Sequence, residues 1–201
     1  MYITENRKLN KKMVVIQPGE HFVSHAEREG IATVLGSCIS VCLYDSETSI
    51  GGMNHFMLPG DFRNDQVFAS KSGRYGMFAM ELLINDMMKQ GANRNRLTAK
   101  IFGGAHVLHF RKNDGNVPDG NILFIRSYLA MEEISIISED LGGEEPRKIF
   151  FLPDENGKVL LKRLKSQEGN LFIGEEKRYK ANIMKTQKQE IAGSVTLFTK
   201  K

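Results

Sequence analysis

The stretch TVLGSCISVCLYDSETSIGGMNHFML, residues 33–58, decides the fold prediction and carries the candidate chemistry. Its segment 38–44 alternates between apolar side chains on one face and cysteine, serine and tyrosine on the other. A period of two predicts a β-strand with one face in the core. Residues 50–58 predict a second strand, and the short polar turn around 46–48 indicates that the two form an antiparallel hairpin.

The register of this hairpin decides whether two reactive side chains meet. A turn centred between Ser46 and Glu47 would place Cys38 directly opposite His55, which lies 17 residues further along the chain. Directly opposed residues hold their Cβ atoms about 4.5–5.5 Å apart, which lets a thiol and an imidazole share a proton. A slip of one residue would put the two side chains on opposite faces of the hairpin.

Cys38 is the candidate nucleophile, although most unpaired cysteines are inert core residues. Gly36 and Ser37 precede it, and backbone N–H groups there could form an oxyanion hole. A thiol with an ordinary pKa of about 8.5 needs a nearby base to act at neutral pH, and His55 could supply that base. Thr33 could donate a hydrogen bond to this site, or it could be an ordinary strand residue.

The other candidate chemistries are less well supported by the sequence. Met53 and Met57 flank His55 and favour a neutral imidazole, but a hydrogen-bonded structural histidine is the alternative. No pair of cysteines or histidines has zinc-type spacing, and the Gly103-Gly104 pair lacks a complete phosphate-binding motif. We therefore expect no metal and no organic cofactor, and we expect Cys42 to be a packing residue.

The rest of the chain predicts a single layered α/β domain with a largely antiparallel sheet packed by helices. Asn156-Gly157 between two apolar runs is a strong hairpin signal. Further strands are predicted at 13–16, 31–35, 97–102, 134–138, 147–152 and 158–164. Helices are predicted at 74–90 and 121–133, and loops at 59–72 and 113–119.

Length and charge predict how this domain is bounded. The chain has 201 residues, which is enough for one good core. We expect a frayed polar arm at 1–12, the domain at 13–166 and a basic extension at 167–201. Residues 175–201 hold seven basic and three acidic residues, so they carry the whole net charge of +4. A balanced core argues against a nucleic-acid groove.

The apolar segments are too short for a membrane span, and the N-terminus lacks the apolar stretch of a signal peptide. We therefore expect a cytoplasmic protein with no membrane insertion. Cys38 and Cys42 lie four positions apart on one predicted strand, about 13 Å at 3.3 Å per residue, which is too far for a disulfide.

At these residues the sequence resembles the CheD family, the chemoreceptor glutamine deamidases of bacterial chemotaxis. The most specific feature is LGSC followed 17 residues later by the histidine of GGMNHFMLP. The resemblance covers residues 17–164, and its segments are TVLGSCISVCLYD, GGMNHFMLPG, RYGMFAMELLIND, KIFGGA, DLGG, RKIFFLP and GKVLLKRL.

This resemblance implies a cysteine hydrolase that converts glutamines of receptor methylation helices to glutamates. Cys38 would be the nucleophile and His55 the general base and acid. The family's site is completed by an upstream threonine; position 32 is Ala here, and the nearest threonine is Thr33. The implied partners are methyl-accepting chemotaxis receptors and, in some species, the phosphatase CheC.

Two other functions remain open from the sequence. A thiol protease or a methylesterase could use the same cysteine and histidine, because it shares the acyl-enzyme step. A non-catalytic adaptor that binds receptors or CheC is the second alternative, and Ala32 is the feature that favours it.

Overall fold

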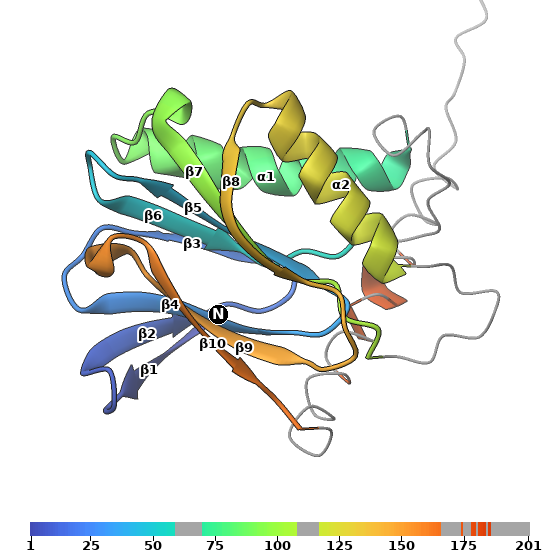
Figure 1. Ribbon diagram of the computed structural model, residues 1–201, viewed down its shortest axis with the longest axis horizontal. Coiled ribbons are helices and arrows are strands. Elements are labelled where there is room, and N and C mark those ends of the chain that lie inside the picture. The colour runs from blue at the N-terminus through green and yellow to red at the C-terminus, as the bar shows by residue number, and fades with distance from the viewer. Residues whose placement is uncertain are drawn as a thin grey trace, which may run out of the picture.

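In the part of the chain that the structure describes, two five-stranded sheets pack face to face, and two helices cover the outer face of one of them (Figure 1). The computed structural model describes residues 1–58, 70–107 and 117–165, together with 174, 178, 179, 181–183 and 185. Strands β2 and β4 are parallel, as are β7 and β8, whereas the other described strand pairs are antiparallel. The prediction of a layered α/β domain with a largely antiparallel core is confirmed.

The first sheet has the order β1-β2-β4-β9-β10 and the second has the order β3-β6-β5-β7-β8. The strands of the first sheet are β1 (Tyr2–Asn6), β2 (Lys11–Val15), β4 (Glu29–Leu35), β9 (Arg147–Leu152) and β10 (Lys158–Arg163). Those of the second are β3 (His21–Ser24), β6 (Ile50–Asn54), β5 (Ile39–Asp45), β7 (Leu97–Gly103) and β8 (Ser135–Leu141). The labelled helices among the described residues are α1 (Lys71–Lys89) and α2 (Val117–Met131), with short 3-10 turns at Arg94–Arg96 and Pro153–Glu155.

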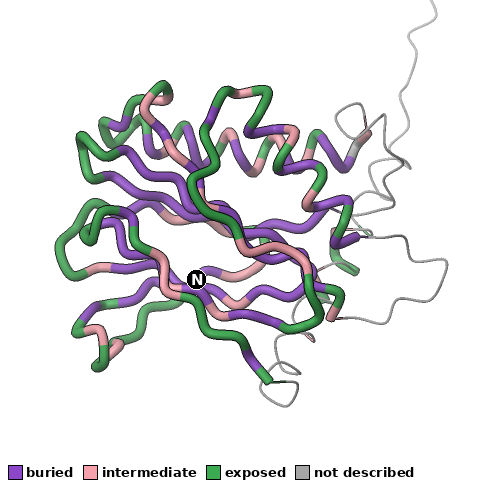
Figure 2. The backbone as a smooth tube through the Cα atoms, viewed as in Figure 1, coloured by how far each residue is buried: buried purple, intermediate pink, exposed green. Residues whose placement is uncertain are grey.

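Alternation along β5 divides the core into two layers. The side chains of Ile39, Val41 and Leu43 pack toward α1 and α2, in one apolar cluster with both helices. Cys38 and Cys42 belong to the cluster between the two sheets. Figure 2 shows that the strands facing both layers are buried along most of their length. The two-residue period of the sequence therefore assigns the candidate cysteine to the interior between the sheets.

Helix α1 is amphipathic, as predicted, but it begins at Lys71, three residues before the predicted start at 74. The hydroxyl oxygen of Ser70 accepts a hydrogen bond from the backbone N–H of Gly73 (2.9 Å), which caps the first turn. Buried side chains recur at three- and four-residue steps on the face toward the second sheet. They are Met80, Leu83, Ile84 and Met87.

The N-terminal segment differs from its prediction. Residues 2–6, expected to be part of a frayed arm, form strand β1 and pair antiparallel with β2. Strand β3 was also not predicted. The side chains of β1 are mostly exposed, so a backbone ladder rather than an apolar face holds this edge strand, and its polar composition hides it.

Several predictions fall wholly or largely outside the described residues. They are most of the loops at 59–72 and 113–119 and of the basic extension at 167–201. Where these loops are described the prediction is wrong, because residues 71–72 belong to α1 and residues 117–119 to α2. Within the described part of the chain, no helix is both long and apolar enough to span a bilayer.

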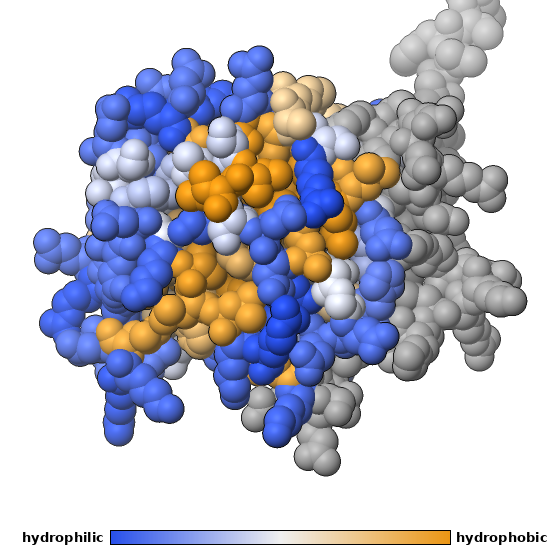
Figure 3. Space-filling view, viewed as in Figure 1, coloured by the Kyte–Doolittle hydropathy of each residue, from blue (hydrophilic) through white to orange (hydrophobic). Residues whose placement is uncertain are grey.

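Apolar side chains also gather on the face formed by α2, β8 and β10 (Figure 3). The exposed apolar residues of these elements are Leu123, Met131, Ile136, Ile137 and Leu161.

Candidate active site

The β5–β6 hairpin has a different register from the predicted one. Asp45 pairs with Ile50, Cys42 pairs with Met53, and an isolated bridge joins Ile39 to Phe56. This register centres the turn between residues 47 and 48, so the predicted direct opposition of Cys38 and His55 is wrong. In this register position 57 lies across from Cys38, so His55 is diagonal to Cys38, two residues from the directly opposed position. Because the shift is by two residues, both side chains stay on the same face.

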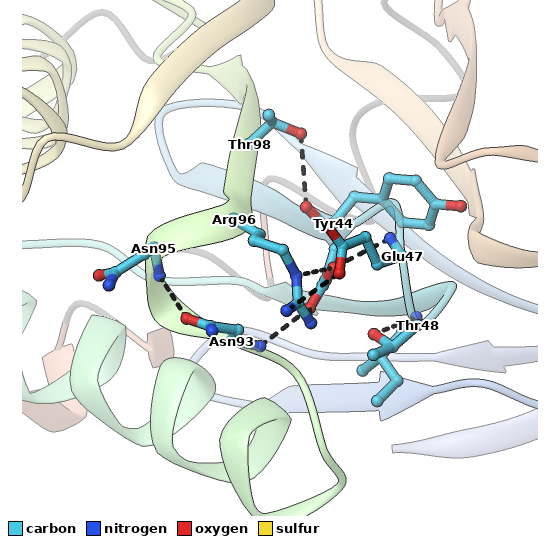
Figure 4. Close-up of polar contacts among 9 residues, drawn as sticks. Tyr44, Glu47, Thr48, Asn93, Asn95, Arg96 and Thr98 are labelled. Atoms are coloured by element: carbon cyan, nitrogen blue, oxygen red, sulfur yellow. Dashed lines mark hydrogen bonds and ion pairs between the residues drawn. The ribbon is translucent and has the colours of Figure 1, made fainter.

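Contacts made by Asp45 explain why the turn sits where it does, and Figure 4 labels three of the partners, Glu47, Asn93 and Arg96. Its buried carboxylate accepts hydrogen bonds from the backbone N–H of Glu47 (3.1 Å) and of Asn93 (2.8 Å). Arg96 donates to both of its oxygens, from Nε (3.0 Å) and Nη2 (2.7 Å). These bonds, chiefly those from Arg96, hold the pKa of Asp45 well below its usual range. A fixed Asp45 therefore ends β5 and sets the register of the hairpin.

Cys38 and His55 are both buried, and neither cysteine forms a disulfide. His55 points into the space between the sheets, because its ring contacts Thr33 of the opposite sheet. The second ring nitrogen, Nε2, is buried and makes no hydrogen bond with any described residue. The resting structure therefore brings the imidazole to the cysteine's side of the hairpin and leaves Nε2 available for a proton donor.

Hydrogen bonds to Thr33 fix the tautomer of His55. The hydroxyl oxygen Oγ1 of Thr33 lies 2.7 Å from His55 Nδ1 and 2.9 Å from the carbonyl oxygen of Ile16. A hydroxyl has one hydrogen to donate, and the carbonyl of Ile16 can only accept it. The proton of the other bond therefore lies on Nδ1, which donates to Thr33, and Nε2 carries the lone pair.

Burial keeps this imidazole neutral. The pKa of His55 is lowered by desolvation to about 3, well below its ordinary value of 6.5. Alternation along β4 turns Thr33 toward His55, whereas Ala32 faces the outer cluster of the first sheet. The structure thus places Thr33, and not position 32, against the histidine.

Three consecutive carbonyl groups orient the segment that leads into Cys38. The carbonyl of Gly36 accepts from the backbone N–H of Ala105 (2.7 Å), and that of Cys38 from the N–H of Gly104 (2.8 Å). The carbonyl of Ser37 accepts from the side chain of Asn121 (2.8 Å). Since a trans peptide directs its N–H away from its C=O, the N–H of Cys38 points away from Asn121.

Two features of this segment were missed by the sequence reasoning. Asn121 is fully buried in α2, and its side chain also accepts from the backbone N–H of Leu58 (2.8 Å), so it joins both arms of the hairpin. Gly103 has a positive φ, and a Cβ there would lie 2.0 Å from the carbonyl oxygen of Cys38. The Gly103-Gly104 pair therefore allows its backbone to approach that of Cys38 closely. For Asn121, the available sequence signal was a polar residue beside the apolar run of a predicted helix.

A pair of tyrosines also belongs to the surroundings of Cys38. The hydroxyl groups of Tyr75 and Tyr179 are hydrogen-bonded to each other. The pKa values of both hydroxyls are raised chiefly by burial, with a further contribution from the charge of Cys38. Tyr179 lies 160 or so residues from Gly19 in sequence, yet its ring fills the space where a Cβ of Gly19 would stand. No local sequence pattern predicts this contact.

A small cavity of about 70 Å³ opens beside His55. It is far smaller than the roughly 300–1,000 Å³ of pockets that enclose a small-molecule ligand. Its lining comes from β6, α1 and the start of β3 and consists of Gly19, Glu20, His21, Asn54, His55, Tyr75, Phe78, Ala79 and Leu82. A cavity of this size fits the tip of one side chain.

The remaining candidates are placed as follows. Cys42 is buried among core residues, and burial raises the pKa of its thiol. Among the described residues there is no cluster of three His, Cys, Asp or Glu side chains that could hold a metal ion.

Comparison with known proteins identifies relatives along most of the chain. The family described as CheD chemotactic sensory transduction matches residues 57–163. A protein of Hahella chejuensis named probable chemoreceptor glutamine deamidase CheD is 48% identical over 189 residues, which cover 92% of this chain and 85% of the relative. Relatives with the same name from Janthinobacterium sp. and, as CheD 1, from Shewanella oneidensis are 42% and 44% identical. The alignments cover 96% and 89% of this chain and 93% and 85% of those relatives. The chain belongs to the CheD family.

Proposed function

We propose that this protein is a chemoreceptor glutamine deamidase that uses Cys38 as nucleophile and His55 as general base and acid. The observation that carries the proposal is the hydrogen-bonded series from Ile16 through Thr33 to His55, which leaves the lone pair of Nε2 on the same face as Cys38. The relatives named above carry this activity in their names, and the contacts of His55 with Thr33 support the proposed roles.

The first half of the reaction forms a thioester. Nε2 of His55 takes the thiol proton of Cys38, and the thiolate attacks the carboxamide carbon of glutamine. The resulting imidazolium then donates that proton to the departing amide nitrogen, and ammonia leaves. Because burial lowers the pKa of His55, taking the thiol proton costs free energy, and returning that proton to the departing nitrogen is favourable.

The second half returns the enzyme to its starting state. His55 takes a proton from a water molecule, and the hydroxide attacks the thioester carbon. The C–S bond breaks, the sulfur recovers the proton from His55, and glutamate is released. Thr33 acts as a positioning residue, because it holds the tautomer that both halves need and touches no reacting atom.

Both halves develop negative charge on the carbonyl oxygen of the substrate. The backbone N–H of Cys38, together with that of Ser37 beside Gly36, supplies the proposed oxyanion hole. Three hydrogen-bonded carbonyls fix the orientation of these peptides before substrate arrives. The peptide groups that carry these donors are therefore held in a fixed orientation before charge develops.

The test is mass spectrometry of a purified receptor cytoplasmic fragment incubated with the protein, with ammonia measured in parallel. We expect glutamine-to-glutamate conversion that is abolished in Cys38→Ala and retained in Cys42→Ala, since both variants lose a buried thiol and only one loses the nucleophile. Cleavage of the fragment would instead identify a thiol protease. An intact, unmodified fragment bound equally by wild type and Cys38→Ala would identify the non-catalytic adaptor.

Two further parts of the proposal concern the setting of the enzyme. We propose a cytoplasmic location, in which the cytoplasmic parts of receptors are accessible. CheC is proposed as a second partner on the family resemblance alone, and it is tested by co-purification with the protein.

A further inference from the structure

We propose that Phe78 and Leu82 of α1 form a docking strip that receives a glutamine-bearing helix of the receptor, laid along α1 so that one glutamine reaches His55. This inference rests on the proposed function, which it extends from the reacting groups to the surface that recognises the substrate.

Exposed apolar side chains on α1 are the first observation. Phe78 is 62% exposed and Leu82 is 37% exposed, on a helix whose opposite face is buried. They are four residues apart, so they lie one above the other on one side of α1. Neither is needed to cover the core, and Ala79 beside them leaves room for a second helix to approach. An apolar ridge of this spacing packs against the groove of another helix.

Continuity with the candidate active site is the second observation. Phe78, Ala79 and Leu82 line the same cavity as His55. That cavity admits one side-chain tip, so the body of any substrate that reaches His55 by this route must remain outside, against the residues at the rim. A glutamine side chain that enters this cavity therefore leaves its backbone at the rim, against Phe78 and Leu82.

A rigid link between the strip and the histidine is the third observation. Asn54, the neighbour of His55, donates from its side chain to the carbonyl of Ala79 (3.4 Å) and accepts from the backbone N–H of Val41 (3.0 Å). Helix α1 packs over β6 and β3 (Figure 1). The docking strip is thus held in register with the catalytic hairpin, as the positioning of a side chain for reaction requires.

The experiment compares Phe78→Ala and Leu82→Ala with Met88→Ala in deamidation of a receptor fragment. Met88 is the matched control, because it is an exposed apolar residue of α1 (44%) outside the cavity. We expect the KM for the folded fragment to rise about tenfold in each strip variant, as for an interface anchor, with kcat unchanged and with Met88→Ala equal to wild type. A photo-crosslinking residue at position 78, but not at 88, should capture the fragment.

Three results would overturn the docking strip. The first is that both strip variants have the kinetics of wild type, and the second is that KM rises equally in Met88→Ala. The third is a dimer that depends on Phe78 in ultracentrifugation, which would assign the strip to a second copy of the chain. Deamidation of a short unstructured glutamine peptide separates the two proposals: the strip variants should retain it. If wild type deamidates neither substrate, the proposed function itself fails; if wild type is active and the strip variants match it, only the docking strip fails.

Discussion

Replacing Thr33 by valine removes one hydroxyl from the site and keeps the volume of the side chain. In the structure that oxygen makes hydrogen bonds to His55 Nδ1 (2.7 Å) and to the carbonyl of Ile16 (2.9 Å), in a fully buried position. Each group left without a partner costs about 1–3 kcal/mol. If the tautomer with its proton on Nδ1 loses about 1.4–2.7 kcal/mol of stabilisation, its population falls about 10–100-fold, and kcat falls with it. KM should change little, because Thr33 touches no substrate.

Kinetics of ammonia release with a receptor fragment would measure kcat and KM for Thr33→Val, and Thr33→Ser should restore most of kcat. The ¹⁵N chemical shifts of the His55 ring report the tautomer directly, and we expect the proton on Nδ1 in wild type and mainly on Nε2 in Thr33→Val. Wild-type kcat in Thr33→Val, together with a lowered free energy of unfolding, would show that the hydroxyl only holds the fold, and the tautomer reasoning would be refuted.

The remaining predictions concern stability. In urea titrations, Gly103→Ala should lower the free energy of unfolding by about 1–2 kcal/mol more than Gly142→Ala does. Both positions have positive φ, but only a Cβ at position 103 meets the carbonyl oxygen of Cys38. Equal losses in the two variants would contradict the close approach. The pKa of His55 is depressed on folding from 6.5 to about 3, so its contribution to stability is complete above pH 6.5 and is lost as pH falls toward 3, by about 1.4 kcal/mol per pH unit. His55→Gln should flatten that dependence, and an unchanged slope would count against a buried neutral ring. Asp45→Asn should lower the free energy of unfolding at pH 7 by about 2 kcal/mol, because the charge partner of Arg96 is lost. The depressed pKa of Asp45 means that this difference is present above its ordinary value near 3.8 and shrinks as pH falls below it, so a pH-independent difference would exclude the ion pair as its cause.

The local sequence pattern was enough to predict the helices and strands whose two faces differ in polarity. The alternation of 38–44, the period of α1 and the Asn156-Gly157 turn predicted β5, α1 and the β9–β10 hairpin, because each needs only neighbours in sequence. Strand β1 has no apolar face and is held by its pairing with β2, so its composition could not reveal it.

The candidate site shows the same division. The sequence predicted that Cys38 and His55 would share a face, and an even register shift preserves that relation. The register itself depended on Asp45 and its contacts with residues about 50 positions away, which no local rule supplies. The contacts of Thr33, Asn121 and Tyr179 likewise join segments that only the packing of the two sheets and helices brings together.

The most direct measurement is the identification of a covalent intermediate by rapid acid quench of the protein during turnover of a glutamine substrate. Peptide mass spectrometry should find a hydroxylamine-sensitive thioester on Cys38, with the mass of the substrate less ammonia, and no adduct on Cys42. Turnover that continues with Cys38 unmodified, or that persists in Cys38→Ala, would contradict the account.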